Sequence, residues 1–384
     1  MSVQDEPESA GVSPPHEPDA GAHPDERAAG LDGRHRNWLH ALFGTADAEH
    51  VPVVAAVAST ALFFALYLLS VAWGLGGAFL DPSTLLGLSA LLGCLGVFVV
   101  LTLLGTWTVG YTAVWRAVEP AFAVDDETYE SFLDARLRRL YDVRPVVVLF
   151  VLLEPAFVLV VTDLNPTVPH DAVLVLVNAV LAFLVLTGVY MFGVHVGTVR
   201  RATEWELENV YTGAHTLEGL VRFSITVAVW WFVGVSLLAV YYWFALSDSL
   251  QVLRSSAGLG LAPAVPLFGV AGHATLLGLL IVGGFATVAV PVWQLHATLR
   301  AARSDLLAAV NARSHETVVG WTRATVDPDD AAARLDVAEQ AAASVQQVRI
   351  WPFDRSGLLK LLLSALIPLS QFALTTVRGV LGLG

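Results

Sequence analysis

Charged residues are scarce in this chain. Only 14% of its 384 residues are Asp, Glu, Lys or Arg, and 55% are hydrophobic, whereas charged residues make up about a quarter of a soluble domain. This composition excludes an ordinary soluble domain and indicates a membrane protein with several spanning helices. Basic residues are fewer than acidic ones, 21 against 34, which disfavours nucleic acid as a partner.

Cysteine and lysine occur once each. Cys94 lies inside an apolar run, so neither a disulfide nor a cysteine-based metal site is available, and we expect no metal and no cofactor. Lys360 lies at the edge of an apolar segment. A retinal protein is therefore excluded, because its Schiff base needs a lysine inside the helical bundle.

Three catalytic motifs are also missing. The sequence has no G-x-x-x-x-G-K-[ST], no H-E-x-x-H and no G-x-S-x-G, so the ATPase, zinc protease and serine hydrolase classes lose their support. We do not expect an enzyme.

What the chain does contain is a series of apolar runs. Those at 51–73, 85–114, 146–162, 172–199, 223–244 and 267–295 are long enough, or nearly so, to cross a bilayer as helices. The fold class predicted is an all-α, polytopic transmembrane bundle over 51–295. Basic residues gather in alternate connections, with Arg254 as the one exception, which predicts a plasma-membrane protein whose N-terminus is cytoplasmic.

Three segments outside the apolar runs have a distinct character. Residues 1–50 are rich in Pro, Asp, Glu and His, and predict a disordered, acidic cytosolic tail that turns amphipathic near Trp38 and Phe43. Residues 126–142 predict an amphipathic cytosolic helix. Residues 296–350 predict a cytosolic hairpin of two Ala-rich helices, suited to self-association or to a cytosolic protein partner.

The end of the chain, 351–384, permits two interpretations. The run 358–377 has the length of a seventh span, but Pro368 interrupts it, and it could instead lie in the inner membrane interface. Three of its polar residues share one helix face: Ser364, Gln371 and Thr375. The segment before it predicts an elbow at headgroup depth, formed by Trp351, Pro352, Phe353 and Asp354.

Two polar side chains fall inside the predicted spans. Glu154 is either functional, as intramembrane acids often are, or a neutral acid hydrogen-bonded to a carbonyl that Pro155 leaves free. Asn178 either joins two helices by a hydrogen bond or contacts a ligand. We take both as candidate site residues.

Small residues and histidines add weaker signals. Gly193 and Gly197 form a small-xxx-small pair that would let another helix approach closely. His195, His273 and His296 stand at span ends, where an imidazole can reach water. None of these histidines pairs with another at the spacing of metal ligands.

Two resemblances concern the layout. The chain resembles uncharacterised multipass membrane proteins of haloarchaea. The resemblance lies in His296-x-x-x-Arg300, where the last of the six apolar runs leaves the membrane, followed by Trp351-Pro352-Phe353-Asp354 and an apolar end with a proline. The architecture is also similar to that of the seven-helix insect chemoreceptor channels, whose last helix lines the pore. That family's terminal motif ends in Gln-Phe, as Gln371-Phe372 does here, while its preceding Thr-Tyr is replaced by Ser364-Ala365.

Three hypotheses about function follow. The first is an oligomeric channel or receptor-like protein with the hairpin 296–350 as its cytosolic assembly domain. The second is a transporter in which Glu154 exchanges protons or cations across the bundle. The third is a non-conducting membrane scaffold that binds a partner through the hairpin.

Overall fold

The computed structural model describes residues 38–44, 46–82, 85–157, 167–208, 210–257, 264–348, 350–351 and 355–381. Apart from one isolated bridge between Phe122 and Leu207, the regular structure in these ranges is helical. The helices are α2 (Trp38–Phe43), α3 (Val51–Ala72), α4 (Gly76–Leu80), α5 (Leu85–Val118), η1 (Glu119–Ala121), α6 (Asp126–Leu140), α7 (Arg144–Phe157), α8 (Pro169–Ala202), α9 (Val210–Thr216), α10 (Glu218–Ala257), α11 (Ala264–Thr322), α12 (Pro328–Gln347) and α13 (Arg355–Leu381).

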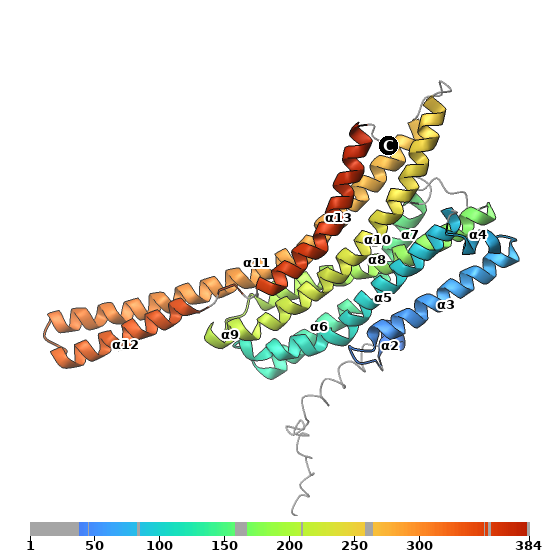
Figure 1. The fold of residues 1–384 in the computed structure, drawn as a ribbon. Helices are drawn as coiled ribbons and strands as arrows, with labels where there is room; N and C mark the ends of the chain where they lie inside the picture. The colour runs from blue at the N-terminus through green and yellow to red at the C-terminus, as the bar shows by residue number, and fades with distance from the viewer. Residues whose placement is uncertain are drawn as a thin grey trace, which may run out of the picture.

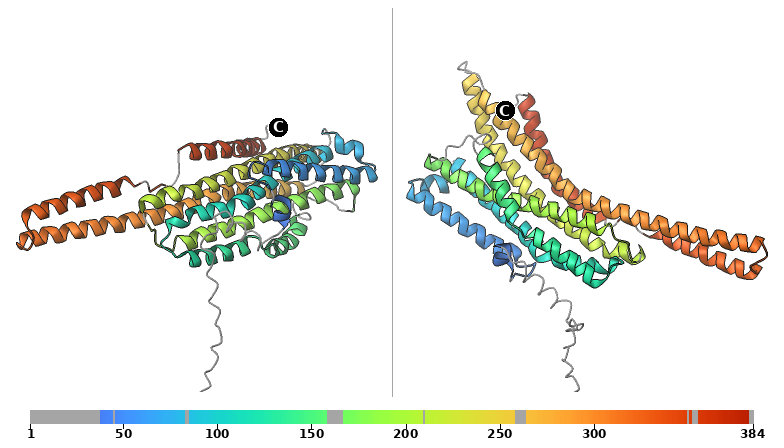
Figure 2. Two further views of the ribbon diagram at one scale, coloured as in Figure 1. Left: turned by 90° about the horizontal axis from the view of Figure 1, so that it is seen from below. Right: turned by 180° about the vertical axis from the view of Figure 1, so that it is seen from behind.

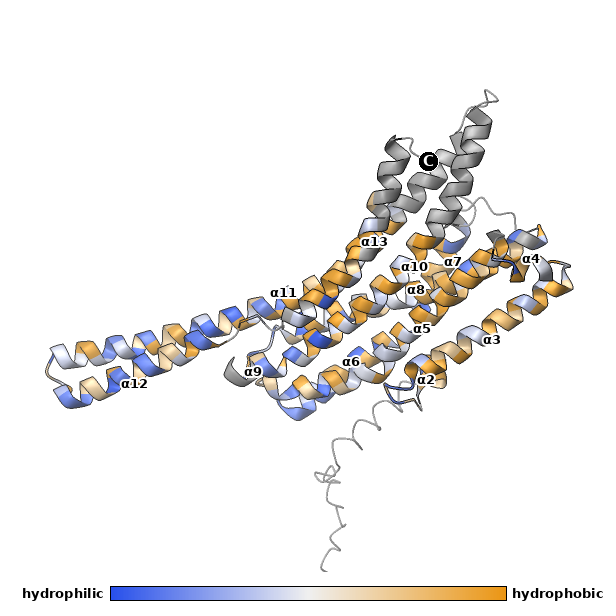
Figure 3. Cartoon of the chain, viewed as in Figure 1, coloured by the Kyte–Doolittle hydropathy of each residue, from blue (hydrophilic) through white to orange (hydrophobic). Residues whose placement is uncertain are grey.

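Five stretches of the described chain are long and apolar enough to cross a membrane. They are Val51–Ala72, Leu86–Ala121, Asp171–Ala202, Gly213–Val240 and Leu277–Thr322. The chain is therefore an all-α membrane protein, and its apolar helices lie together in one bundle (Figure 3). The mostly orange ribbon there contrasts with the mixed colours of the part of α11 and α12 that projects from the bundle.

Helix α5 occupies the centre of this bundle. It packs against α3, α8 and α10, and 67% of its apolar window is buried, compared with 22% for α3. The bundle has two distinguishable ends (Figure 1). We call them the α6 end, where α6 and α9 lie and from which α11 and α12 project, and the α4 end, on the opposite side.

Two segments are compared with the sequence predictions. The predicted span 146–162 coincides over residues 146–157 with α7. Residues 158–162 lie outside the described ranges. Trp38–Phe43, predicted within a disordered tail, forms α2, because Leu39 and Phe43 bury their side chains in the bundle core.

Helices α11 and α12 form an antiparallel pair that extends well beyond the bundle, as all three ribbon views agree (Figures 1 and 2). We call residues 297–347 the hairpin. Asp327 caps the N-terminus of α12, and its carboxylate accepts a hydrogen bond from the Asp329 N–H at 2.9 Å. Near the bundle, Arg303 donates to the Gln346 carbonyl at 2.8 Å and joins the two helices.

Helix α11 is continuous from the bundle into the hairpin. It has 59 residues, a rise of about 88 Å at 1.5 Å per residue. The helix bends between the two regions (Figure 1), and it contains Pro291, a common cause of such bends. One continuous helix therefore connects the apolar bundle with the projecting hairpin.

Candidate functional site

A cavity opens between α5, α8, α10 and α11 in the half of the bundle nearer the α4 end. Its volume is about 70 Å³, below the range of about 300–1,000 Å³ that is typical of sites for drug-sized ligands. Most of its walls are apolar side chains: Leu92, Val100, Leu103, Leu174, Val177, Leu181, Val185, Val235, Leu237, Leu238 and Leu280. We call it the four-helix cavity.

Glycines explain why these helices meet and yet leave space. A Cβ added to Gly93 would come within 2.3 Å of the Val177 side chain, so Gly93 lets α5 and α8 approach closely. Gly96 and Gly234 also line the cavity, and each has room for a Cβ, with nearest side-chain atoms at 3.4 Å and 3.6 Å. At these two positions the absent side chains contribute to the empty volume.

Three polar side chains line the cavity besides Trp231: Ser89, Asn178 and Trp230. The Ser89 hydroxyl is buried and has no hydrogen-bond partner among the described residues. Asn178 is half-buried, and no hydrogen bond joins its amide to the described part of the chain. The predicted bond from Asn178 to a neighbouring helix is thus absent there, and its side chain lines the cavity instead.

Trp231 differs from these three because its indole N–H has a partner. It donates to the Leu280 carbonyl of α11 at 2.9 Å. A Cβ on Gly284, one turn further along α11, would meet the Trp231 and Phe232 rings at 2.7 and 2.8 Å. This hydrogen bond and this close contact fix α10 against α11 at the wall of the cavity.

Glu154 lies on α7 and is 8% exposed. Its Oε1 atom has no hydrogen-bond partner within the described ranges, and Glu154 is not part of the cavity wall. Helix α7 packs against α8, with the Phe150 and Phe183 rings 5.7 Å apart. The opposite face of α7 is exposed at Val148, Val151 and Leu152, so Glu154 points toward the bundle and away from the exposed side.

The candidate residues of the chain end are only partly described. Ser364 is half-buried on α13 and donates to the Leu361 carbonyl of its own helix. Gln371 and Thr375 belong to α13, but their side chains, like residues 352–354 of the predicted elbow, lie outside what the structure describes. Trp351 stacks on His296, with ring centroids 3.9 Å apart and planes 13° from parallel.

The predictions about small residues and histidines have different outcomes. Gly193 and Gly197 have no described atom within 4 Å of an added Cβ, so no other described helix packs closely against them, and their role as a helix contact stays a prediction. His195 and His296 are buried and do not reach water, with 2% and 8% exposure. The reason is packing, because the His296 Nδ1–H donates to the Ile350 carbonyl at 2.9 Å and the Trp351 ring stacks on the imidazole. The His273 side chain lies outside the described set.

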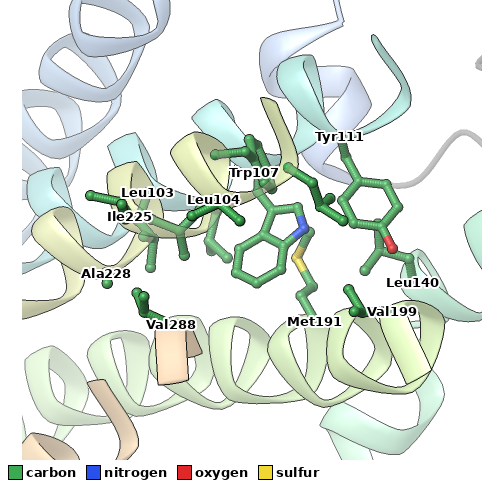
Figure 4. Close-up of a cluster of buried hydrophobic side chains, with 14 of the residues drawn as sticks. Leu103, Leu104, Trp107, Tyr111, Leu140, Met191, Val199, Ile225, Ala228 and Val288 are labelled. Atoms are coloured by element: carbon green, nitrogen blue, oxygen red, sulfur yellow. The ribbon is translucent and has the colours of Figure 1, made fainter. Parts of the chain in front are cut away.

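His195 belongs to an aromatic cluster that the sequence reasoning did not anticipate. Four rings surround the imidazole with centroids 5.7–6.3 Å away: Trp107, Tyr111, Trp115 and Phe223. Its Nε2 lies 3.3 Å from the Ser224 hydroxyl. Figure 4 shows Trp107 lying among aliphatic side chains, with Met191 beside its ring. The sequence did contain a signal for this cluster, because the aromatic residues Trp107, Tyr111 and Trp115 repeat at four-residue spacing on one helix face.

At the α6 end, α6 closes the bundle through Tyr129. Its hydroxyl donates to the Trp115 carbonyl of α5, and burial raises the tyrosine pKa above its usual range. Arg116 pairs with Glu130 at 3.1 Å. The guanidinium of Arg136 lies 5.1 Å from the Phe132 ring centre, and desolvation lowers its pKa. These contacts hold α6 in place against α5.

In the described ranges, no group of three or more His, Cys, Asp or Glu side chains is placed to hold a metal ion. Comparison of the chain with protein families, with curated proteins and with solved structures finds no match.

Proposed function

We propose that this chain is a receptor-like membrane protein that binds a small apolar molecule from the bilayer in the four-helix cavity and reports its presence through α11. The observation that carries the proposal is the continuity of α11. Its residue Leu280 lines the cavity and accepts the Trp231 hydrogen bond, and the same helix continues into the hairpin. A ligand that displaces α11 at Leu280 therefore moves the hairpin.

The proposed topology has the N-terminus and the hairpin in the cytoplasm of a plasma-membrane protein. It is supported by the gathering of α6, α9 and the base of the hairpin at one end of the bundle (Figure 1), since these segments and their connections carry most arginines. In this topology α7 is the third of six spans. Helix α13 is a seventh, because it runs beside α10 and α11 toward the end opposite the hairpin.

The hairpin is the proposed output surface. It leaves large apolar side chains exposed, with Trp321 at 52% and Val337 at 65%, and exposed apolar patches favour protein contacts. We propose a second copy of the chain as the partner, as in a homo-oligomer, since the open faces of Gly193 and Gly197 on α8 offer a further close contact within the membrane.

A second candidate function rests on Glu154. A buried carboxyl whose Oε1 has no partner among the described residues is expensive in a bilayer, which favours a proton- or cation-coupled transporter. In that case Glu154→Gln abolishes uptake of a driving ion into vesicles, whereas the receptor proposal predicts that the same variant changes nothing in the hairpin.

The receptor proposal is tested by measuring the hairpin while the cavity is filled by a side chain. Spin labels at Ala135→Cys on α6 and Ala343→Cys on α12, both exposed, report their separation in Cys94→Ala protein in lipid nanodiscs. Gly234→Leu projects into the cavity, where a Cβ meets its nearest neighbour at 3.6 Å. We expect this substitution to shift the distance distribution.

The matched control is Gly278→Leu, which adds the same side chain where no described atom lies within 4 Å of a Cβ and is expected to leave the distribution unchanged. Identical distributions in all three proteins would overturn the proposal. The Ala343→Cys variant also reports its side of the membrane, because an impermeant thiol reagent should label it only after intact cells are opened.

A further inference from the structure

A group of arginines lies where α6 meets the C-terminal part of α8. On α6, Arg136 stands one turn from the buried residues Leu133 and Leu140, so its side chain begins on the face of the helix that is turned toward the bundle. Its guanidinium lies over the Phe132 ring, 5.1 Å from the ring centre. The Nε atom of Arg136 is buried and has no hydrogen-bond partner among the described residues.

Helix α8 brings a further arginine to the same place. The Tyr190 hydroxyl donates to the Arg139 carbonyl at 2.6 Å, which fixes the last turn of α6 against α8. Arg201 follows Tyr190 by three turns on the same face of α8. Burial is the main cause that lowers the pKa of Arg136, and the positive charges of Arg139 and Arg201 lower it further. The three guanidinium groups therefore lie close enough to repel one another.

This arginine cluster, Arg136, Arg139 and Arg201, has little countercharge. Arg201 pairs with Glu204 at 3.2 Å, and Glu204 opposes part of the repulsion on Arg136. No ion pair joins Arg136 or Arg139 to a carboxylate of the described chain. Asp142, which follows α6, accepts a hydrogen bond at 3.0 Å from a backbone N–H of the next turn. Three guanidinium groups thus share one paired carboxylate, although acidic residues outnumber basic ones in the chain, 34 to 21. A partly buried cation without a partner is costly, and an anion bound between the arginines would remove that cost.

Exposed apolar side chains border the arginine cluster. Val189 precedes Tyr190 on α8 and is exposed, and so are Val147 and Val148 in the first turns of α7. In a helix bundle that spans a membrane, such side chains face lipid chains. The arginine cluster therefore lies beside the boundary of the hydrocarbon at the α6 end, at the depth of the lipid phosphates, where basic side chains attract anionic lipids.

We infer that Arg136, Arg139 and Arg201 bind a phosphate group, carried by an anionic lipid of the leaflet at the α6 end. Guanidinium groups match the geometry of phosphate oxygens and form charge-assisted hydrogen bonds with them. A zwitterionic lipid also has a phosphate, but its ammonium group is repelled by the same arginines. This site lies in the opposite half of the bundle from the four-helix cavity, and the inference does not depend on the receptor proposal.

The test measures lipid binding to the full chain in neutral detergent by native mass spectrometry. Phosphatidylglycerol and phosphatidylcholine with identical acyl chains are the two probes. We expect phosphatidylglycerol to bind at least about tenfold more tightly than phosphatidylcholine. The double variant Arg139→Gln, Arg201→Gln should weaken phosphatidylglycerol binding about fivefold for each arginine removed and leave phosphatidylcholine binding unchanged.

The choice of variants separates binding from folding. Arg139 is exposed and its guanidinium has no described partner, so Arg139→Gln alone leaves the packing of α6 intact and should still weaken phosphatidylglycerol binding about fivefold. The matched control is Arg313→Gln with Arg334→Gln, which makes the same change in net charge at exposed positions of the hairpin. It should keep the wild-type preference.

Three results would overturn the inference. The first is equal binding of the two lipids to the wild type. The second is an equal loss of phosphatidylglycerol in the cluster variants and in the hairpin control, which would mean that only net charge matters. The third concerns the source of the phosphate: incubation with an excess of inorganic phosphate should leave the lipid bound, and displacement of the lipid would mean that the arginines take the free ion.

Discussion

The two halves of the bundle are built from the same helices in opposite ways. Toward the α6 end, α5 carries Trp107, Tyr111 and Trp115, which fill the space between helices around His195 and are 1% exposed or less. Toward the α4 end the same helix carries Gly93 and Gly96, and the four-helix cavity opens beside them. Side-chain volume along α5 thus divides the bundle into a solid half and a hollow half.

This division has a physical basis in the membrane. Lipid chains are as apolar as leucine, so helices in a bilayer associate by packing and hydrogen bonding and not by escape from water. The aromatic half supplies the packing that holds the helices together. The glycine half can then keep an unfilled space without loss of the fold. Because the solid half holds α11 in place, the part of α11 beside the cavity can shift relative to it.

The largest expected effect comes from emptying the solid half. Trp107→Ala removes a ring that is 1% exposed and should lower the free energy of unfolding by about 3–5 kcal/mol, as large-to-small substitutions in tight cores do. Thermal unfolding in detergent measures the loss. Trp293→Ala is the matched control, because that ring is 67% exposed, and an equal loss in both variants would refute a solid core at Trp107.

A smaller effect is expected from overfilling the helix contact beside the cavity. Gly93→Val places a Cβ 2.3 Å from Val177, which forces α5 and α8 apart and should cost about 1–3 kcal/mol. Gly278→Val, where nothing lies within 4 Å, should leave the unfolding temperature nearly unchanged. If Gly93→Val is as stable as Gly278→Val, the close approach of α5 and α8 is not what holds the cavity wall.

The glycines also show what the sequence could predict. The five apolar stretches are readable because crossing a bilayer depends on length and composition along one segment. The role of a glycine depends on which other helix faces it. Gly193 and Gly197 have the spacing of a helix contact and yet face open space, while Gly93 and Gly284 make close contacts with Val177 and Trp231.

The candidate site could be predicted from the sequence only in part, because its residues also depend on which helices face one another. Asn178 stands out as a polar residue in an apolar run, and the cavity gives it a place on a wall that Ser89 shares. Ser89 gave no comparable signal, because serines in membrane helices commonly bond to their own backbone, as Ser70 does at the Leu66 carbonyl. Only the three-dimensional contacts distinguish an unpartnered serine from a satisfied one.

The smallest effect concerns α6, which closes the solid half. Asp125 precedes α6 and accepts a 2.8 Å hydrogen bond from the Thr128 N–H, which lowers the carboxyl pKa below its usual value. A lowered folded-state pKa stabilises the helix above the usual Asp pKa of about 4, and this stabilisation is lost as the pH falls through the folded value. The first turn of α6 should therefore loosen in acid, while the Tyr129 contact holds the rest of the helix.

A spin label at Glu127→Cys measures this loosening as an increase in mobility as the pH falls from about 5 to below the usual Asp pKa of about 4. Asp125→Asn keeps an oxygen that can accept the Thr128 hydrogen bond but removes the titrating group, so its mobility should not depend on pH over the same range. Asp126 remains in both proteins, and the difference between them isolates Asp125. An identical pH profile in the two proteins would mean that the start of α6 does not depend on the charge of its cap.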